Sequence, residues 1–141
     1  YPRETAIAEK FHTIVVRGIL NSRMKDYYDI WALCQESEFA GAVLSKAITA
    51  TFHRRKTDLP DGMPVGLSDE FVSDRSKQTQ WAAFIRRTPL RISENNLGLV
   101  VSSLREFLMP PCSAAACGTS FAKKWQKNGA WSDSPQTVQS A

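Results

Sequence analysis

The stretch that decides the fold is residues 3–20, which read RETAIAEKFHTIVVRGIL. Apolar side chains recur in it at helical spacing, so they line one face of a helix and leave the charged residues on the other. Pro2 precedes the stretch and suits the first turn of a helix. The pattern therefore predicts an amphipathic helix that ends near Gly18 to Asn21. Its apolar face consists of Ile7, Phe11, Ile14, Val15 and Ile19.

A second helix is expected after a short polar link at residues 21–24. A link this tight joins two helices as a helical hairpin. Further helices are predicted over residues 39–52, from 68 to 71, over 76–87 and over 97–109, with a surface loop at 58–64. The apolar face of the second helix contains Tyr27, Ile30, Trp31, Leu33 and Cys34. The expected fold is mostly α, a helical hairpin plus a helical bundle.

The C-terminal part of the chain lacks a clear periodic pattern. The last helix should stop at Pro110 and Pro111, because proline has no backbone N–H to donate. We therefore expect a helical region over residues 1–111 and an irregular tail over 112–141. Its tryptophans, Trp125 and Trp131, either dock on the body or belong to a segment that needs a further part of the protein to fold. No alternating apolar pattern is long enough to predict a sheet.

Length and composition limit the classes of protein to which the chain can belong. At 141 residues and 43% hydrophobic, the chain fits one globular domain with a modest core. Its apolar runs are far shorter than the roughly 18–20 residues of a membrane span, so no membrane contact is expected. Three cysteines without metal-ligand spacing favour reduced thiols, no zinc and a cytoplasmic location. The chain starts without Met or a signal-peptide pattern and reads as the interior of a longer reading frame.

The charge balance permits an anionic partner without requiring one. The formal net charge is +4, but 14 acidic residues are interspersed with 18 basic ones. The dense basic cluster, residues 53–56, falls at the end of a predicted helix, where the helix dipole favours cations. On the first predicted helix, Arg3 and Lys10 are seven residues apart and share a face with Glu4 and Glu9 nearby. Taken alone, that pattern favours a solvated surface.

Two carboxylates on the second predicted helix are candidates for a functional site. Asp26 and Asp29 are three residues apart, which places them on one face with roughly 5–6 Å between their Cβ atoms. Held together they need cations, which Arg23 and Lys25, a metal ion or a substrate phosphate could supply. Asp26 lies near the helix N-terminus, where a carboxylate caps N–H groups. Asp29 has no such structural reason to be there.

The hairpin could bring Lys10 and the two acids onto one cleft wall. In phosphoryl or nucleotidyl transfer a lysine neutralises phosphate charge, and a carboxylate orients or deprotonates the attacking group. The sequence has no candidate for the Gly-rich phosphate loop or the paired-acid strand motif that two-metal nucleotidyl transfer also needs. The residues therefore predict one part of such a site.

Two runs of sequence carry a family resemblance: residues 1–11, YPRETAIAEKF, and residues 21–31, NSRMKDYYDIW. They closely resemble the C-terminal two motifs of the AbiEii/AbiGii toxin family of nucleotidyltransferases. The similarity covers nearly the whole chain, continuing through residues 39–55, 80–81, 104–110, 125 and 129–131. The stretch with Cys112 and Cys117 departs from the family pattern, and the N-terminal portion with its Gly-Ser phosphate loop and metal-binding acids is not in this sequence.

The resemblance implies the C-terminal half of an α/β nucleotidyltransferase-fold protein whose N-terminal sheet domain is absent. Such a protein would be the toxin of a toxin–antitoxin or abortive-infection system, with a separately encoded antitoxin as its counterpart. The N-terminal domain would hold Mg²⁺ and the nucleoside triphosphate, and the acceptor could be an RNA. The helical half would close the site and be inactive by itself.

Carried over to this sequence, the resemblance assigns Lys10 to the triphosphate. Asp26 and Asp29 would complete the active site opposite the metal-binding acids, and no metal ligand is expected in this chain. The residues that would orient these groups or contact substrate are Glu9, Arg23, Lys25 and, as a weaker candidate, Glu4.

Two other interpretations stay open from the sequence. The chain could be a helical module that binds RNA through Arg54, Arg55 and Lys56 together with exposed aromatic side chains. It could also be a structural or interaction domain, in which Asp26 is a helix cap and Asp29 a solvated acid.

Overall fold

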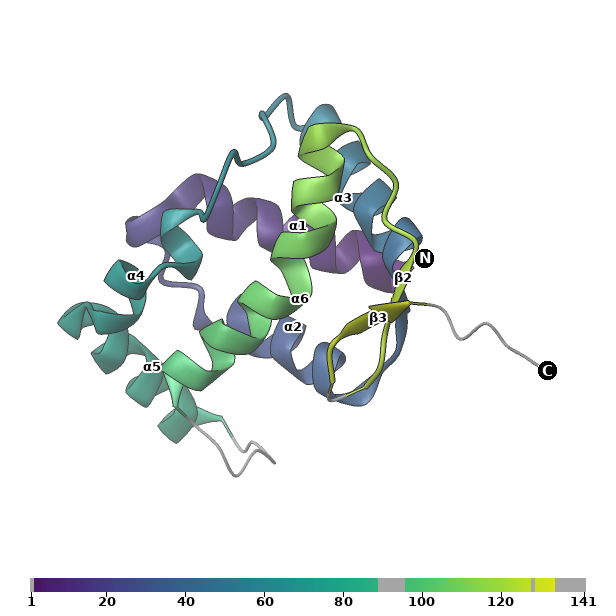
Figure 1. Cartoon of the computed structure of the whole chain (residues 1–141). Coiled ribbons are helices and arrows are strands. Elements are labelled where there is room, and N and C mark those ends of the chain that lie inside the picture. Colours follow the sequence, from purple (N-terminus) through teal and green to yellow (C-terminus); the bar gives the residue numbers. More distant parts are fainter. Residues whose placement is uncertain (1, 89–95, 128, 134–141) are drawn as a thin grey trace.

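The computed structural model describes residues 2–88, 96–127 and 129–133. Within them the fold is a bundle of six α-helices with a small three-stranded sheet at one side, which confirms the mostly α prediction (Figure 1). The helices are α1 (Pro2–Arg17), α2 (Met24–Glu36), α3 (Gly41–Arg54), α4 (Asp69–Ser73), α5 (Arg75–Arg87) and α6 (Leu97–Cys117). Short 3-10 turns are η1 (Gly18–Leu20) and η2 (Val65–Leu67), and the strands are β1 (Phe39–Ala40), β2 (Lys123–Trp125) and β3 (Trp131–Asp133).

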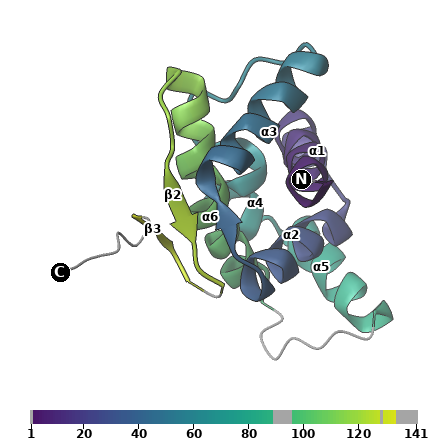
Figure 2. The same ribbon diagram turned by 90° about the vertical axis from the view of Figure 1, so that its right-hand side faces the viewer.

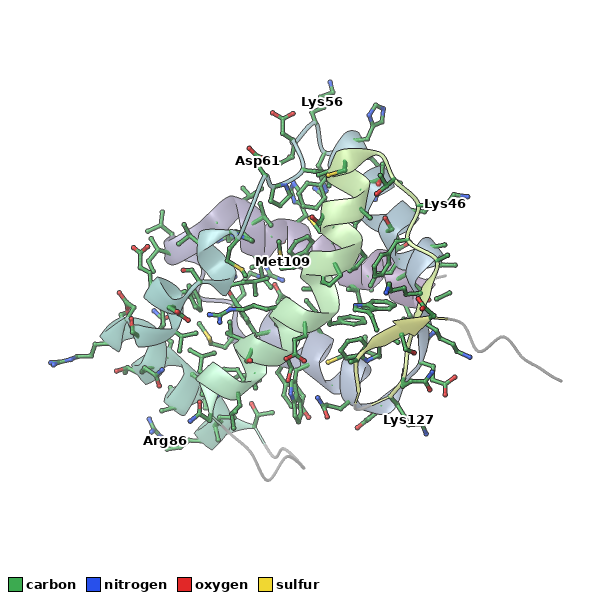
Figure 3. All side chains as sticks on the ribbon, in the orientation of Figure 1. Lys46, Lys56, Asp61, Arg86, Met109 and Lys127 are labelled. Carbon is green, nitrogen blue, oxygen red and sulfur yellow. The ribbon has the colours of Figure 1, made fainter. Side chains whose placement is uncertain are left out.

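The core lies where α1, α2 and α3 meet α6. The predicted stripe of α1 is largely confirmed, because Ile7, Phe11 and Ile14 are fully buried, whereas Val15 and Ile19 pack at its edge. Burying each such side chain contributes about 1.5–3 kcal/mol to the free energy of unfolding. From the side, β2 and β3 lie beside α6 and α1 lies on the opposite side of the molecule (Figure 2). Charged side chains such as Lys46, Lys56 and Lys127 point outward (Figure 3).

Side-chain caps and a buried tyrosine fix the elements around the hairpin. Ser68 and Asp74 accept hydrogen bonds from backbone N–H groups at the starts of α4 and α5. Tyr27 of α2 is buried, and its hydroxyl donates to the carbonyl of Gly66 at 2.8 Å. No Cβ could stand at Gly66, since it would lie 2.6 Å from the carbonyl oxygen of Ile14. This close approach holds η2 against both helices of the hairpin.

Helix α6 passes through Pro110 and Pro111, so the prediction that it stops there was wrong. A proline in a helix frees the carbonyl four residues earlier, which for Pro111 is that of Phe107. The indole Nε1 of Trp131 donates to this carbonyl at 3.0 Å. The carbonyl of Pro111 itself accepts from the hydroxyl of Ser45 at 3.0 Å. Contacts from distant residues therefore stabilise the helix, which bends along its length (Figure 1).

The segment that follows α6 is ordered as far as the structure describes it, unlike the predicted irregular tail. Residues 112–117 complete α6, and β2 pairs antiparallel with both β1 and β3 in a sheet whose strands are too short for an alternating pattern to predict. Trp125 docks on the body, because its Nε1 donates to the carbonyl of Cys34 at 2.8 Å. Residues 134–141 of the predicted tail, and residues 89–95 between α5 and α6, lie outside the described residues.

The third helix begins later in the chain than predicted, because the residues before it belong to the sheet. The predicted helix begins at Phe39, but Phe39 and Ala40 form β1 and α3 begins at Gly41. A Cβ at Gly41 would lie 2.8 Å from the carbonyl oxygen of Lys123, so a glycine is required where β2 crosses. No helix in the described part of the chain is long and apolar enough to cross a membrane.

Candidate functional site

A buried turn directs the start of α2. The side chain of Asn21 is fully buried, and its Oδ1 accepts a hydrogen bond from the backbone N–H of Arg23 at 3.1 Å. Its own N–H donates to the carbonyl of Gly18 at 3.1 Å. Asp26 then falls in the first turn of α2, where the helix dipole favours a carboxylate.

Lys10 of α1 lies between the two carboxylates of α2, as the hairpin pattern predicted. Its Nζ is 3.7 Å from Oδ1 of Asp26 and 3.4 Å from Oδ2 of Asp29. The side chain of Asp26 is 4% exposed, that of Asp29 23% and that of Lys10 29%. The three charges thus sit at the boundary between the core and solvent, where Coulomb interactions are stronger than at an open surface.

Each carboxylate has a second cation from its own helix or from the turn before it. Arg23 Nε donates to Asp26 Oδ2 at 2.9 Å, and Lys25 Nζ donates to Asp29 Oδ2 at 2.8 Å. The hydrogen bond to Asp29 and the charge of that carboxylate raise the pKa of Lys25. Three cations therefore surround two acids. This is the neutralisation that the spacing of Asp26 and Asp29 required.

These groups line one cavity of about 550 Å³. Helix α5 forms its other wall with Gln80, Ala83, Phe84 and Arg87. Among the residues that the structure describes, four cationic side chains, including Arg87, and two anionic ones face the cavity, so a polyanion would be attracted into it. The described residues of its lining are Lys10, Ser22, Arg23, Met24, Lys25, Asp26, Asp29, Gln80, Ala83, Phe84 and Arg87.

Gln80 and Arg87 line the cavity but were not among the site residues predicted from the sequence. Their spacing with Phe84, at positions 80, 84 and 87, places them on one face of α5 and was a usable signal. A cation in the last turn of a helix has an ordinary structural explanation, however, because it complements the helix dipole. Only the packing of α5 against α2 shows that this face borders the cavity.

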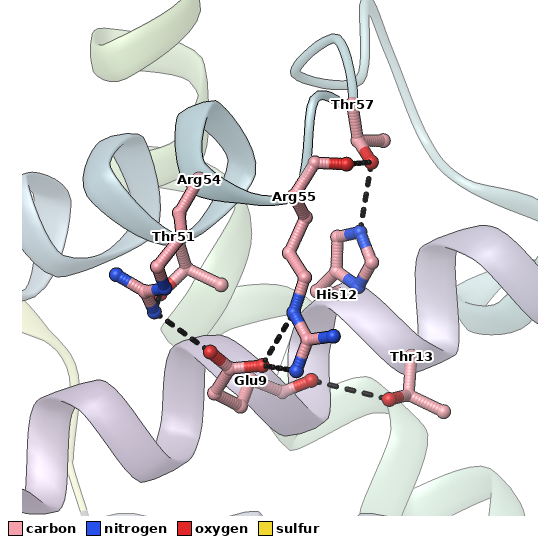
Figure 4. Close-up of polar contacts among 7 residues, drawn as sticks. All are labelled: Glu9, His12, Thr13, Thr51, Arg54, Arg55 and Thr57. Carbon is pink, nitrogen blue, oxygen red and sulfur yellow. Dashed lines mark hydrogen bonds and ion pairs between the residues drawn. The ribbon is translucent and has the colours of Figure 1, made fainter.

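Glu9 reaches from α1 to two arginines at the end of α3 (Figure 4). Its Oε2 is 2.7 Å from Nη2 of Arg54, and its Oε1 is 2.6 Å from Nη2 of Arg55. The hydrogen bonds from Arg54 and then Arg55 lower the pKa of the Glu9 carboxyl. Glu9 thus forms its ion pairs with Arg54 and Arg55, two of the residues considered for RNA binding, and not with the groups that pair with Asp26 and Asp29.

Glu4 lies in the first turn of α1 and does not line the cavity. It is buried beside Arg3, whose guanidinium is 3.4 Å from Oε2 of Glu4 and donates to the carbonyl of Glu38 at 3.2 Å. Arg3 also stacks over the ring of Phe39 at 4.4 Å from its centroid. The structure therefore does not bring Glu4 together with Lys10.

A second polar cavity of about 440 Å³ adjoins the first. The two share Lys10, Arg23 and Asp26 in their linings. The second is completed by Ala6, Glu9, Thr13 and Arg55. The pair formed by Lys10 and Asp26 can therefore be reached from two sides.

The family model of the nucleotidyl transferase AbiEii toxin of type IV toxin–antitoxin systems matches residues 1–107. The chain belongs to the AbiEii family. No curated protein and no solved structure matches the chain. The match covers α1 to α5 and reaches into α6, so every residue that lines the first cavity lies within it.

Membership of the AbiEii family confirms the resemblance seen in the two N-terminal runs of sequence. It places the chain among nucleotidyltransferase toxins, and a type IV toxin–antitoxin system implies a separate antitoxin as counterpart. The roles of individual residues are a further step, because a family match does not assign them.

Mg²⁺ does not fit the carboxylates that this chain brings together. Among the described residues, no group of three or more His, Cys, Asp or Glu side chains could hold a metal ion. Asp26 and Asp29 are moreover already contacted by three cationic side chains, whereas Mg²⁺ prefers oxygen ligands in an octahedral arrangement.

Proposed function

We propose that the cavity between α1, α2 and α5 binds the triphosphate of a nucleoside triphosphate during nucleotidyl transfer by an AbiEii toxin. The observation that supports this most strongly is the position of Lys10, held by Asp26 and Asp29 in a cavity with an excess of cations. An ammonium group held in place needs little reorganisation when phosphate charge develops in the transition state. Lys10 is then the principal triphosphate contact, with Arg23, Lys25 and Arg87 around it.

The two aspartates have different parts in this proposal. Both oxygens of Asp26 contact cations, Oδ1 to Lys10 and Oδ2 to Arg23, so Asp26 orients the cations. In the described part of the chain, both contacts of Asp29 fall on Oδ2. Its Oδ1 is left to accept a hydrogen bond from the attacking hydroxyl of the acceptor.

In the same proposal the chain supplies only part of the active site. The family resemblance implies that a Gly-Ser phosphate loop and the acids that bind Mg²⁺ come from a preceding α/β domain. Residues 1–141 would then be inactive without it. The acceptor is proposed to be an RNA, so the reaction would take place in the cytoplasm.

The test measures nucleotide transfer and growth arrest by the complete gene product that carries these residues. Lys10→Ala and Asp29→Asn are compared with wild type, and circular dichroism checks that each variant is folded. Lys46→Ala is the control, because Lys46 is an exposed lysine on α3 that does not line this cavity. We expect both site variants to lose at least about 100-fold in transfer rate and to lose toxicity. Wild-type transfer in folded Lys10→Ala would refute the assignment.

The alternative of an RNA-binding module has one supporting observation. Arg54 and Arg55 share a single carboxylate, so one positive charge of the pair is not balanced by it. Replacing Arg54, Arg55 and Lys56 by alanine should then weaken RNA binding and flatten its salt dependence. Unchanged binding across a salt series would exclude this function.

A further inference from the structure

Lys77 of α5 is a buried lysine behind the wall of the proposed nucleotide cavity. Its exposed fraction is 4%, and it does not itself line the cavity. Its Nζ donates to the carbonyl of Asn21 at 2.8 Å and to Oε1 of Gln80 at 3.3 Å. It also lies 5.5 Å from the centroid of the Phe71 ring.

The partners of Lys77 are unusual for a buried ammonium group. Lysine is rarely buried unless an acidic side chain pairs with it, because the charge is costly to remove from water. Among the described residues no carboxylate lies within the 4.0 Å of an ion pair with Lys77, and both hydrogen-bond acceptors are neutral. An apolar side chain of similar length would fill the same space without this desolvation cost. The hydrogen bonds of Lys77 therefore call for an explanation beyond packing.

The first hydrogen bond ties α5 to the turn that starts α2. Asn21 accepts from Lys77 through its carbonyl and from the N–H of Arg23 through its side chain. Lys77 and Arg23, which lines the cavity and pairs with Asp26, are thus linked through one residue. A shift of Asn21 would move the first turn of α2 relative to α5.

The second hydrogen bond sets the direction of an amide on the cavity wall. A lysine ammonium can only donate, so the oxygen of the Gln80 amide must face Lys77 and the nitrogen must face away from it. That nitrogen donates to the hydroxyl of Ser76 at 3.3 Å and has a second hydrogen for another acceptor. Gln80 lines the cavity. Because Lys77 holds its amide oxygen, the amide N–H of Gln80 can donate a hydrogen bond to a phosphate oxygen in the cavity.

We propose that Lys77 is a positioning residue that sets the spacing between the α2 wall and the α5 wall of the cavity and turns the Gln80 amide toward the triphosphate. This inference rests on the proposed function of the cavity. Lys77 acts through its two hydrogen-bond partners, Asn21 in the turn that leads into α2 and Gln80 on the α5 wall.

The test replaces Lys77 by methionine, which keeps the length of the side chain and removes the donor. The complete gene product is used, and inorganic triphosphate serves as the probe because it tests phosphate recognition whichever nucleotide is transferred. Calorimetry measures the Kd, and hydrogen exchange measures the opening of the backbone over residues 20–28. Ser45→Ala is the control, since it removes a buried hydrogen bond, to Pro111, away from this cavity.

We expect Lys77→Met to raise the Kd by about tenfold, the equivalent of one hydrogen bond, and to speed exchange over residues 20–28. Gln80→Ala should raise the Kd without changing that exchange, which separates the two hydrogen bonds. Ser45→Ala should change neither. Rescue by Lys77→Arg, which restores a donor, would add support.

Two results would overturn the inference. One is a Kd for folded Lys77→Met equal to that of wild type, and the other is unchanged exchange over residues 20–28. An unchanged Kd in Lys10→Ala would instead overturn the proposed function and with it the nucleotide part of this inference. The exchange result would still decide whether Lys77 holds the turn at Asn21.

Discussion

Two consecutive residues of α1, Glu9 and Lys10, belong to two separate charge clusters. Lys10 is one cation between two acids, Asp26 and Asp29, and Glu9 is one acid between two cations, Arg54 and Arg55. The side chain of Asp26 is 4% exposed, whereas those of Arg54 and Arg55 are 55% and 54% exposed.

The two ion clusters differ in their surroundings more than in their charges. Neighbouring residues on a helix point about 100° apart, so Lys10 meets α2 and Glu9 meets α3. The Lys10 cluster borders two cavities and holds a cation where a polyanion can reach it. The Glu9 cluster joins α1 to the end of α3, at an exposed surface where ion pairs contribute little.

The largest expected effect is on the affinity for ligand, and it distinguishes the Lys10 cluster from the Glu9 cluster. Lys10→Ala should raise the Kd for inorganic triphosphate by at least about tenfold, because one cation contact to phosphate is lost. Glu9→Gln should change it less than about threefold, since Glu9 faces the arginines of α3. Calorimetry on the complete gene product measures both. Equal effects of the two variants would show that the clusters act as one site.

The second expected effect is on the free energy of unfolding, and it distinguishes Asp26 from Asp29. Asp26→Asn should lower the free energy of unfolding by about 2 kcal/mol, because it breaks pairs of a buried carboxylate whose partners are partly exposed. Asp29→Asn should lower it by less than about 0.5 kcal/mol. Urea unfolding monitored by circular dichroism checks both values. A larger loss for Asp29→Asn would contradict the division between an orienting acid and an acid that contacts substrate.

The Glu9 cluster should contribute a smaller and salt-sensitive stabilisation. Glu9→Gln should lower the free energy of unfolding by about 0.5–1 kcal/mol at low salt, and high salt should reduce this difference because both arginines are exposed. Asp26 is buried whereas Glu9 is partly exposed, so Asp26→Asn should show a weaker salt dependence. Urea unfolding at two ionic strengths decides this, and a salt-independent effect of Glu9→Gln would count against a surface cluster.

The smallest expected effect is a pH dependence from His12, which adjoins the Glu9 cluster. Its Nε2 is 2.9 Å from the hydroxyl of Thr57 (Figure 4). Burial, and then the positive charge of Arg55, lower the pKa of His12 below its ordinary value of 6.5. The unfolded chain therefore binds a proton more readily, so the stability that His12 contributes is present above pH 6.5 and falls as the pH drops below that value.

The check is urea unfolding of wild type and His12→Gln at pH 7.5 and at about pH 5.5. The wild type should lose more stability than His12→Gln between these two conditions. An equal loss in both proteins would mean that other groups cause the pH dependence.

Much of the site could be expected from local sequence. The 3.6-residue period identified both helices of the hairpin, and the short link at residues 21–24 predicted that Lys10 would meet Asp26 and Asp29. The α5 wall could not be expected in the same way. Gln80 and Arg87 are more than fifty residues from Asp26, and nothing local records which face of α5 packs there.

The prolines of α6 show why a correct local rule can fail. Pro110 and Pro111 remove two N–H donors from a helix, and the rule that they end it depends on the freed carbonyls finding no other partner. Trp131 supplies the partner for the freed carbonyl of Phe107, and Ser45 adds a hydrogen bond to the carbonyl of Pro111, which fixes the helix after the prolines. These donors come from 24 and 66 residues away in sequence, so no window of sequence around the prolines contains the information.

The sequence by itself determined the helices, the hairpin and the membership of the AbiEii family, because these depend on spacing and on motifs within short stretches. Tertiary structure decided that Glu9 pairs with α3, that α5 closes the cavity and that Lys77 links its two walls. It also decided that α6 continues past its prolines to meet a small sheet. Each of these depends on which residues, distant along the chain, are brought together when the apolar faces of the helices are buried against each other.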